Sequence, residues 1–356
     1  LLVIACPCAL VVSIPLDYFG GICRASRMGI LVKGSNFIDA LAAVKTVVFD
    51  KTGTLTQGNF EVQQVVTQNG IGETEFLKYA AAAEIQSSHP IGKSILKEVE
   101  KRKLKSDNSS ITEHMAIPGR GVRAMVDGRE VLVGNDALLH HQKIAHDICE
   151  LNGTVAHVAV DGLYAGYILI GDTLKPEAPK AISDLRLNGV EKVVMLTGDN
   201  QCAAQSVAKH LGMDAFHAGL LPEDKVRLLE EIKADTNHGG KIAFVGDGIN
   251  DAPVIARADV GVAMGALGSD AAIETADVVL MTDSPLKMAI AVKVAKETRK
   301  IVWQNIVMAL SVKGLFIVLG AFGVASMWEA VFADMGVALA ATANATRALG
   351  ARRAAS

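Results

Sequence analysis

Asp50 opens the segment DKTGTLT and directly follows the apolar, β-branched run VKTVVF. Such a run is typical of a buried parallel strand, and open α/β sheets place their active sites at the carboxyl ends of these strands. A carboxylate in that position can act as a nucleophile toward phosphorus and become an acyl phosphate. Lys51, Thr52 and Thr54 carry groups that can hold phosphate oxygens, and Gly53 lets the backbone approach closely. The segment therefore predicts phosphoryl transfer to Asp50.

Seven residues in this order after an apolar strand are the signature of P-type ATPases, and the chain resembles that family. The segments TGDN (197–200) and GDGINDAP (246–253) follow apolar runs in the family's order. The resemblance implies that TGDN holds the phosphoryl group, that GDGINDAP supports a Mg²⁺ site, and that the lysine of PEDK neutralises the phosphorylated aspartate. The catalytic residues so implied are Asp50, Lys51, Thr52, Thr197, Gly198, Asp199, Lys225, Asn250 and Asp251. The implied Mg²⁺ ligands are Asp50, Thr52 and Asp247.

The segment EIQSSHPIGKSI (84–95) resembles the Ser-x-His-Pro signature of the heavy-metal (type IB) P-type ATPases. By itself, a histidine before Pro90 is typical of a helix start, since proline suits the first helical turn. The resemblance implies instead an ATP pocket in which the histidine contacts adenine and glycines admit the purine. Its residues would be Glu84, His89, Gly119, Gly121 and Gly134. A second histidine group, His140, His141 and His146, is interpreted as the polar surface of a helix rather than a metal site.

Cys6 and Cys8 flank Pro7 inside the apolar run LLVIACPCALVVSIP. Proline removes a backbone donor and unwinds a spanning helix locally, which turns both thiols toward the interior of a helix bundle. Thiolates suit Cu⁺, Zn²⁺ and similar soft ions. The alternative is a pair of small buried hydrophobes. In the family that the chain resembles, this trio is the transport site.

Two charges in the C-terminal apolar segments bear on which metal is carried. The segments SVKG and ADMG, with Lys313 and Asp334, resemble signatures of the Zn²⁺/Cd²⁺/Pb²⁺ exporters. Lys313 lies thirteen residues after Lys300, and Asp334 lies thirteen residues before Arg347. At 1.5 Å per residue both are about 20 Å from these anchors, so they should reach similar depths. We expect Asp334 to join the cysteines on the ion, and Lys313 to pair with Asp334 once the metal has left.

Composition separates an apolar beginning and end from an ordinary globular middle. The chain has 356 residues, is 50% hydrophobic and has a net charge of −3, which offers no basic surface for nucleic acid. Its five cysteines do not make a disulfide framework. The predicted fold combines membrane α-helical segments with α/β: a haloacid-dehalogenase-like Rossmannoid phosphorylation domain with an inserted α+β nucleotide-binding domain. The predicted limits are a partial spanning helix and stalk (1–39), the phosphorylation domain (40–57 and 168–297), the nucleotide-binding domain (58–167) and two spanning helices (298–356).

These patterns together predict ATP-driven export of Zn²⁺, Cd²⁺ or Pb²⁺ through an aspartyl phosphate, with ATP and Mg²⁺ as cofactors. The alternatives are a Cu⁺ pump and, from another class, a haloacid-dehalogenase-type phosphatase. The expected setting is the lipid bilayer of the plasma membrane, with the catalytic domains cytoplasmic. Since the chain begins inside an apolar run and lacks a T-G-E loop, we expect it to need an upstream part, with actuator domain and earlier helices, for transport.

Overall fold

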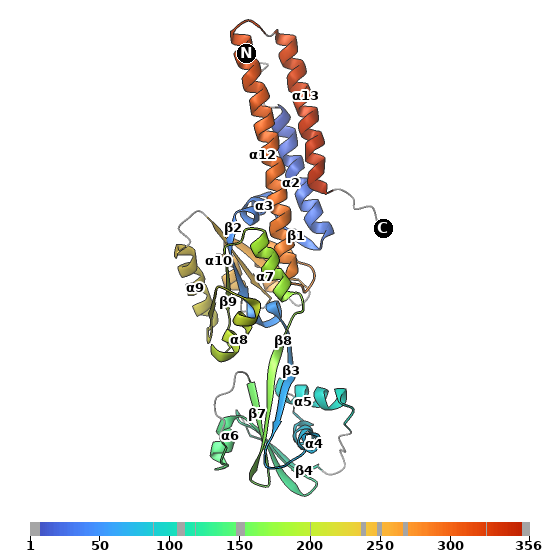
Figure 1. Cartoon of the computed structure of the whole chain (residues 1–356), viewed down its shortest axis with the longest axis vertical. Coiled ribbons are helices and arrows are strands. Elements are labelled where there is room, and N and C mark those ends of the chain that lie inside the picture. Colours follow the sequence, from blue (N-terminus) through green and yellow to red (C-terminus); the bar gives the residue numbers. More distant parts are fainter. Residues whose placement is uncertain are drawn as a thin grey trace. The chain divides into compact units, whose positions relative to one another are not determined.

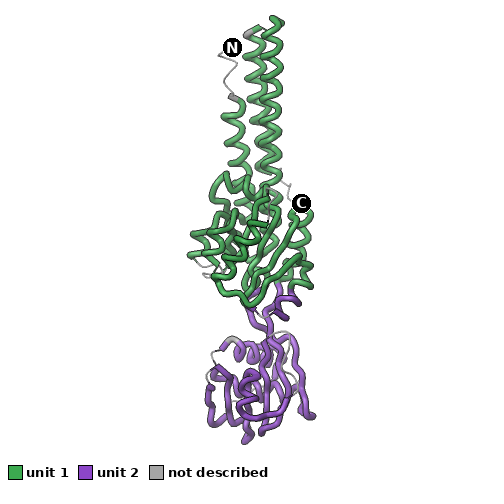
Figure 2. Tube along the Cα trace, turned by 90° about the vertical axis from the view of Figure 1, so that its left-hand side faces the viewer, with its two compact units in different colours: residues 1–55, 175–198, 208–356 green, residues 56–174, 199–207 purple. Residues whose placement is uncertain are grey.

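The computed structural model of the chain falls into two units (Figures 1 and 2). It describes residues 8–87, 89–104, 111–117, 119–146, 154–199, 201–235, 240–247, 251–265, 270–324 and 326–350. Unit 1 comprises Leu1–Leu55, Lys175–Gly198 and Ala208–Ser356, and unit 2 comprises Thr56–Leu174 and Asp199–Val207. Most of unit 2 is therefore inserted into unit 1 directly after the first long parallel strand.

Unit 1 contains a seven-stranded sheet in the order β1-β13-β12-β11-β2-β9-β10. Neighbouring strands run parallel except for β1, which pairs antiparallel with β13. The strands are β1 (Ile30–Val32), β2 (Val44–Asp50), β9 (Lys192–Leu196), β10 (Ala215–His217), β11 (Lys241–Gly246), β12 (Val260–Met264) and β13 (Val278–Leu280). The helices that alternate with them are α3 (Ser35–Ala42), α7 (Ala178–Leu187), α8 (Gln201–Leu211), α9 (Pro222–Asp235), α10 (Ala252–Arg257) and α11 (Asp270–Thr275). The predicted parallel α/β sheet is confirmed, and the antiparallel edge is an addition to it.

The central strands of this sheet are apolar throughout because helices cover them. Val48, Val194 and Phe244, on three neighbouring strands, are fully buried in one core with Leu229 of α9 and Val254 of α10. Strands buried on both faces cannot alternate polar with apolar residues. This explains the unbroken runs in the sequence, and it fixes the strand ends where the polar residues begin.

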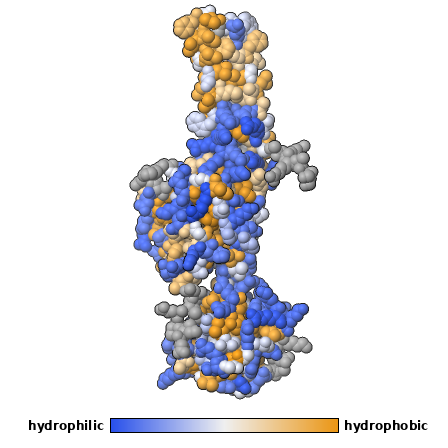
Figure 3. Space-filling model, viewed as in Figure 1, coloured by the Kyte–Doolittle hydropathy of each residue, from blue (hydrophilic) through white to orange (hydrophobic). Residues whose placement is uncertain are grey.

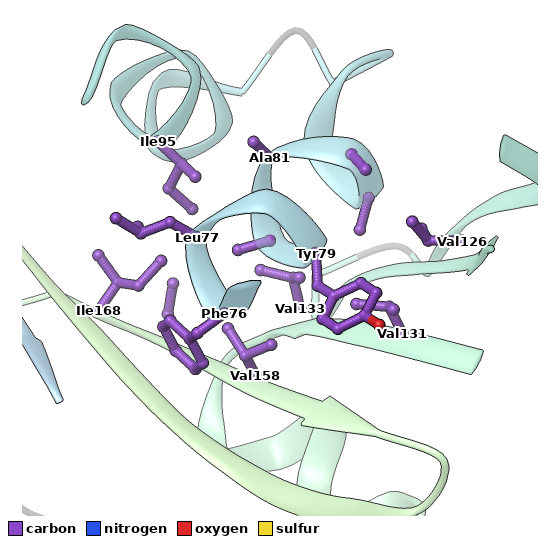
Figure 4. Close-up of a cluster of buried hydrophobic side chains, with 14 of the residues drawn as sticks. Phe76, Leu77, Tyr79, Ala81, Ile95, Val126, Val131, Val133, Val158 and Ile168 are labelled. Atoms are coloured by element: carbon purple, nitrogen blue, oxygen red, sulfur yellow. The ribbon is translucent and has the colours of Figure 1, made fainter. Parts of the chain in front are cut away.

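Unit 2 is an antiparallel sheet of six strands in the order β3-β8-β7-β6-β5-β4, with helices packed against it. The strands are β3 (Thr56–Thr67), β4 (Ile111–Ile117), β5 (Gly121–Val126), β6 (Arg129–Gly134), β7 (Thr154–Val160) and β8 (Leu163–Leu174). The helices are α4 (Glu73–Glu84), α5 (Pro90–Lys101) and α6 (Asp136–His141). Its core brings Phe76 and Leu77 of α4 and Ile95 of α5 against the sheet (Figure 4). The inserted segment of the unit begins at Thr56 and ends at Leu174, and these two end residues are partners in the antiparallel pairing of β3 with β8.

Three helices of unit 1 extend beyond its sheet: α2 (Cys8–Arg27), α12 (Leu286–Ala321) and α13 (Met327–Ala345) (Figure 1). They pack on one another, and α2 approaches α12 so closely that a Cβ on Gly21 would lie 2.5 Å from Thr298 Oγ1. Their outer surface is strongly hydrophobic (Figure 3). It exposes large apolar side chains that include Trp303, Val307, Leu310, Leu315, Val318, Phe322, Trp328, Phe332 and Leu339.

Among the described helices, α12 is long and apolar enough to cross a membrane, with a mean hydropathy of 1.7 in its most apolar window. Helix α13 has 19 residues and does not meet the same criterion by itself, since Glu329 and Asp334 interrupt its apolar sequence. Glu329 forms a capping box with Ser326 at the start of α13, so this charged side chain has a structural role at the helix end. The second predicted span, α13, stays a prediction.

A buried polar group joins the three helices. Asn305 of α12 donates through Nδ2 to both carboxylate oxygens of Asp17 in α2, at 3.1 and 3.0 Å. Asn344 of α13 donates to Asn305 Oδ1 at 2.9 Å. Asp17 and Asn305 are fully buried, and a buried polar group that loses its partner is costly. These hydrogen bonds therefore fix the rotation of each helix about its axis and the axial register between neighbouring helices.

Candidate active site

The candidate active site lies where three neighbouring strands of unit 1 end. Strand β2 lies between β9 and β11, and its last residue, Asp50, is level with Leu196 of β9. Thr197 follows Leu196 and is almost wholly buried, while Asp247 follows the last residue of β11. The parallel register thus brings together residues from three separate sequence segments at one edge of the sheet.

Asp50 is held in a buried network with one lysine and a second acid. Lys225 Nζ donates to Asp50 Oδ1 at 2.6 Å and to Asp251 Oδ1 at 2.8 Å. All three residues are less than a tenth exposed. Burial first, and then the charge of Asp251, raises the pKa of Asp50 to about 7, although Lys225 opposes this shift. Burial by itself would lower the pKa of Lys225, but the two carboxylates outweigh it and raise that pKa. The lysine therefore stays charged and favours the ionised nucleophile.

Asp247 gives the site a third carboxylate. Oxygen atoms of Asp50, Asp247 and Asp251 lie within 4.8 Å of one another. Burial first, and then Asp251, raises the pKa of Asp247 to about 6, with a smaller contribution from Asp283. Three crowded carboxylates with one lysine leave an excess of negative charge, and oxygen ligands suit Mg²⁺. The residues therefore fit a bound Mg²⁺ ion. Asp251 is itself a member of this carboxylate group, whereas the sequence analysis did not count it among the Mg²⁺ ligands.

The loop between Asp50 and β3 depends on Gly53 and on a lysine that the sequence analysis did not single out. Gly53 has a φ of +72°, and a Cβ on it would lie 1.6 Å from Asp247 Oδ2, so glycine is required there. Lys175 Nζ donates to the Gly53 carbonyl and pairs with Asp283 Oδ1 at 2.7 Å. Lys175 is 3% exposed. Its only sequence signal is its place in GDTLKPEA, where the chain returns to the sheet.

The other predicted active-site residues have varied surroundings. Lys51 is buried, whereas Thr52 is exposed. Thr54 is fully buried, and its Oγ1 has no hydrogen-bond partner among the described residues. Gly198 is exposed at the end of its segment in unit 1, and Asp199 belongs to unit 2. Asn250 lies outside the described residues.

Unit 2 has its own cavity of about 550 Å³, and all five residues predicted for nucleotide binding line it. These are Glu84, His89, Gly119, Gly121 and Gly134. The cavity is also lined by His114 and Asn135, which the sequence analysis missed because neither belongs to a motif it used. Its volume is in the range of pockets that hold small organic ligands.

Glu84 and His89 present polar groups to this cavity. His89 caps α5, since its Nδ1 accepts a hydrogen bond from Ile91 N at 3.3 Å. The neutral ring therefore carries its proton on Nε2, which leaves a donor on the side away from the helix. Glu84 is 5% exposed, and its Oε2 has no hydrogen-bond partner among the described residues. Burial raises the pKa of Glu84. An orphaned buried acceptor of this kind suits a ligand with an N–H donor.

Two of the pocket glycines are required by the sheet itself. Gly121 and Gly134 are paired on neighbouring strands. A Cβ on Gly121 would lie 2.1 Å from the Val133 carbonyl oxygen, and one on Gly134 would lie 2.2 Å from that of Arg120. These contacts are with backbone, which cannot move aside cheaply. The sequence analysis assigned these glycines to purine contact alone, and the structure adds the close approach of β5 and β6.

The predicted pair in the helix bundle is formed. Lys313 Nζ lies 3.5 Å from Asp334 Oδ1, and both line a cavity of about 150 Å³ between α12 and α13. Their side chains are 14% and 32% exposed. Cys8 is the first residue of α2, which packs on both helices, but its side chain is not among the described ones. Cys6 and Pro7 lie outside the described residues.

Comparison with known families agrees with the sheet of unit 1. The family model for the haloacid dehalogenase-like hydrolases matches residues 44–259, which is more than half of the chain. The match begins at the first residue of β2 and includes the whole of the insertion. The strand that carries Asp50 is thus the first element of the shared fold.

Similarity to individual proteins extends over almost the whole chain. It is 61% identical over 347 residues to a zinc-transporting ATPase of Synechocystis sp., with 98% of this chain and 48% of that protein covered. It is 40% identical over 352 residues to a zinc/cadmium/lead-transporting P-type ATPase of Escherichia coli, with 98% and 47% covered. A crystal structure of a zinc-transporting PIB-type ATPase in the E2.Pi state matches with a TM-score of 0.86 and 38% identity, covering 97% of this chain and 56% of that one. The chain spans about half the length of the curated relatives it matches.

The first prediction concerns Asp247, whose raised pKa costs stability. Because its pKa is about 6 when folded, against an ordinary value of 3.8, the folded state binds its proton more tightly. Stability is therefore lost as pH rises through this window. At neutral pH without Mg²⁺, Asp247→Asn should raise the melting temperature by a few degrees, and the difference should vanish toward pH 4. Calorimetry should also show that Mg²⁺ stabilises the native chain more than the variant. Asp127→Asn, at an exposed turn, is the control, and an equal response to Mg²⁺ in all three proteins would contradict the site.

The second prediction separates backbone strain from backbone collision in unit 2. Gly121 and Gly128 both have positive φ, but a Cβ on Gly128 meets nothing within 4 Å. Gly128→Ala should therefore cost about 1 kcal/mol, and Gly121→Ala about 3 kcal/mol or more. Hydrogen exchange of the β5 and β6 amides measures both losses. Equal costs would mean that β5 and β6 do not approach as closely as described.

Proposed function

Because the chain belongs to the haloacid dehalogenase-like hydrolases and, within them, to the heavy-metal P-type ATPases, we propose that it couples ATP hydrolysis to the export of a divalent soft metal ion. The observation that carries this proposal is the buried Asp50, held at a strand end by Lys225 beside two further acids. The relatives named above transport zinc, cadmium or lead. Their names favour Zn²⁺ or Cd²⁺ over the Cu⁺ alternative.

The proposed chemistry is transfer of a phosphoryl group to Asp50. A carboxylate oxygen of Asp50 attacks the γ-phosphorus of ATP, the bond from that phosphorus to the β,γ-bridging oxygen breaks, and ADP leaves. Water later hydrolyses the acyl phosphate to free Asp50 and phosphate. Lys225 favours the ionised form of Asp50 before transfer and offsets the charge of the phosphoryl group after it. We assign Thr197 and Gly198, which follow β9, to the phosphoryl oxygens, together with Lys51 and Thr52.

We assign the Mg²⁺ ion to Asp50, Asp247 and Asp251, with Thr52 and Asn250 as further predicted members of the site. Bound there, the ion would neutralise negative charge on the carboxylates and on the phosphoryl group. Gly53 leaves room for Asp247 within this group. Lys175 holds the Gly53 carbonyl and so positions the loop.

ATP is assigned to the cavity of unit 2. A neutral adenine offers an amino donor and ring nitrogen acceptors. The orphaned Glu84 oxygen can accept from the amino group, and the Nε2 proton of His89 can donate to a ring nitrogen. His114 and Asn135 are further members of the pocket.

The transported ion is assigned to Cys6 and Cys8 with Asp334 as a third ligand. Two thiolates balance a divalent charge, and the carboxylate adds a harder oxygen ligand. Lys313 lies close enough to replace the ion at Asp334 after release. A charge at this depth is costly without a partner, so this exchange keeps Asp334 paired in both states. The proposed setting is a plasma membrane that the helix bundle of unit 1 enters, with the seven-stranded sheet of unit 1 and the whole of unit 2 on its cytoplasmic side.

The third prediction tests the nucleophile. Asp50→Asn should abolish acid-stable, hydroxylamine-sensitive labelling from γ-labelled ATP in native membranes, because an amide cannot form the acyl phosphate. Asp127→Asn should label as the native protein does. Undiminished labelling of Asp50→Asn at a matched expression level would overturn the proposed phosphoryl transfer.

The fourth prediction tests the metal ligand and its counter-charge. Asp334→Ala should lower Zn²⁺-stimulated ATPase activity about tenfold or more, whereas Glu329→Ala, which only loses a helix cap, should change it about twofold at most. Lys313→Ala should lower the maximal rate more than it changes the Zn²⁺ concentration for half-stimulation, because it acts on release. Lys300→Ala on the same helix is its control. Full stimulation in Asp334→Ala would remove this residue from the site.

A further inference from the structure

A cluster of metal-ligating side chains lies in unit 2 away from the residues assigned above. Asp136, His140 and His146 each offer one ligand atom, and these atoms lie within 4.8 Å of one another. The sequence analysis interpreted His140, His141 and His146 as a polar helix surface, which is wrong for His146. That residue follows α6, and its side chain is 1% exposed. His141 is exposed and does not belong to the cluster.

Local structure brings these three residues together. Asp136 and His140 are four residues apart on α6, so they share one face of the helix. The helix ends at His141, Lys143 two residues later has a φ of +56°, and Ile144 N donates back to the Leu139 carbonyl oxygen at 3.0 Å. This ending turns the chain back along the helix and buries Ile144. His146 consequently returns to the level of Asp136.

The hydrogen bonds of His146 indicate that a cation belongs between it and Asp136. His146 Nδ1 lies 3.1 Å from the Ile144 carbonyl oxygen, which can only accept, so Nδ1 carries a proton. In the neutral ring Nε2 then presents a lone pair, and it lies 2.5 Å from Asp136 Oδ1. Two lone pairs at this distance repel each other unless a proton or a metal ion lies between them. A backbone carbonyl that fixes the second nitrogen is the usual support of a metal-binding histidine.

We propose that Asp136, His140 and His146 form a third metal site, distinct from the Mg²⁺ and transport sites, that takes a borderline divalent ion such as Zn²⁺. Two imidazole nitrogens and one carboxylate oxygen are a typical Zn²⁺ set that leaves a fourth position for water. Mg²⁺ and Ca²⁺ prefer oxygen ligands throughout, so the histidines select against them. This proposal does not depend on the transport function.

The ligand separations suit this assignment. His140 Nε2 lies 3.0 Å from Asp136 Oδ2, on the oxygen that His146 does not use. Ligands of a tetrahedral Zn²⁺ ion at the usual bond lengths are about 3.3 Å apart, so a small opening of the cluster admits the ion. His140 is 62% exposed and Asp136 38%, which leaves the fourth position open to solvent. His146 is held from behind by the rings of His157 and Tyr164, whose centroids lie 5.4 and 5.6 Å away.

The fifth prediction is tested by metal titration of the detergent-solubilised chain. Cys6→Ser and Cys8→Ser remove the proposed transport site, and millimolar Mg²⁺ occupies the three-carboxylate site. Co²⁺ added to this background should give the visible absorption of a bound ion, and Zn²⁺ should displace it. His140→Ala and Asp136→Asn should each weaken Zn²⁺ binding about tenfold or more, while His141→Ala should leave it unchanged.

His140 and Asp136 are partly exposed, so their variants should keep the fold even where His146→Ala does not. Melting temperatures measured without metal check this point. Zn²⁺ binding of equal strength in His140→Ala, Asp136→Asn and His141→Ala would overturn the proposal. The proposal is also overturned if the chain with Cys6→Ser and Cys8→Ser binds no Co²⁺ or Zn²⁺, since the cation between His146 and Asp136 would then be a proton only.

Discussion

The active site is organised by one buried ammonium group that faces more carboxylate charge than it can neutralise. Lys225 bonds to Asp50 and Asp251, yet the pKa of Asp50 stays raised to about 7 and that of Asp247 to about 6. Such a site is not at its most stable when it is left without a cation. In the function proposed above, this excess charge would draw in a divalent ion with the phosphates of a nucleotide, and it would disfavour phosphorylation until that ion is bound. The parallel sheet supports this arrangement because successive residues of the neighbouring strands β2, β9 and β11 are buried.

Much of this arrangement could be predicted from the sequence, since residues at the ends of consecutive parallel strands must meet at one edge. Asp50, Thr197 and Asp247 follow this rule, and so does the fold around them. Lys175 and Asp283 do not, because they reach the loop at Gly53 from segments without a motif. Their pairing depends on a side-chain contact between distant segments, which no local pattern records.

In the helix bundle too, some contacts could be predicted from the sequence and others could not. Counting residues from the basic anchors predicted similar depths for Lys313 and Asp334, and the cost of unpaired charges there predicted that the two would pair without metal. The group that sets the helices against one another, Asp17 with Asn305 and Asn344, was not predicted. A single acid in α2 has no periodicity that marks it as buried. Its partner Asn305 lies 288 residues away in the chain, so only the packed structure brings the two together.

Three groups of ligating residues in this chain differ in the ions that they suit, and the difference follows from their donor atoms. The carboxylates around Asp50 are hard and buried, which suits Mg²⁺. The Cys-Pro-Cys segment is soft, and the histidine cluster of unit 2 is intermediate and open to solvent. Asn135 caps the helix that carries Asp136 and also lines the nucleotide cavity, and Ala156 lines that cavity directly before His157. An ion bound by the histidine cluster would thus stabilise two of the segments that shape the nucleotide pocket. By reciprocity, a nucleotide that orders those segments would strengthen the binding of that ion.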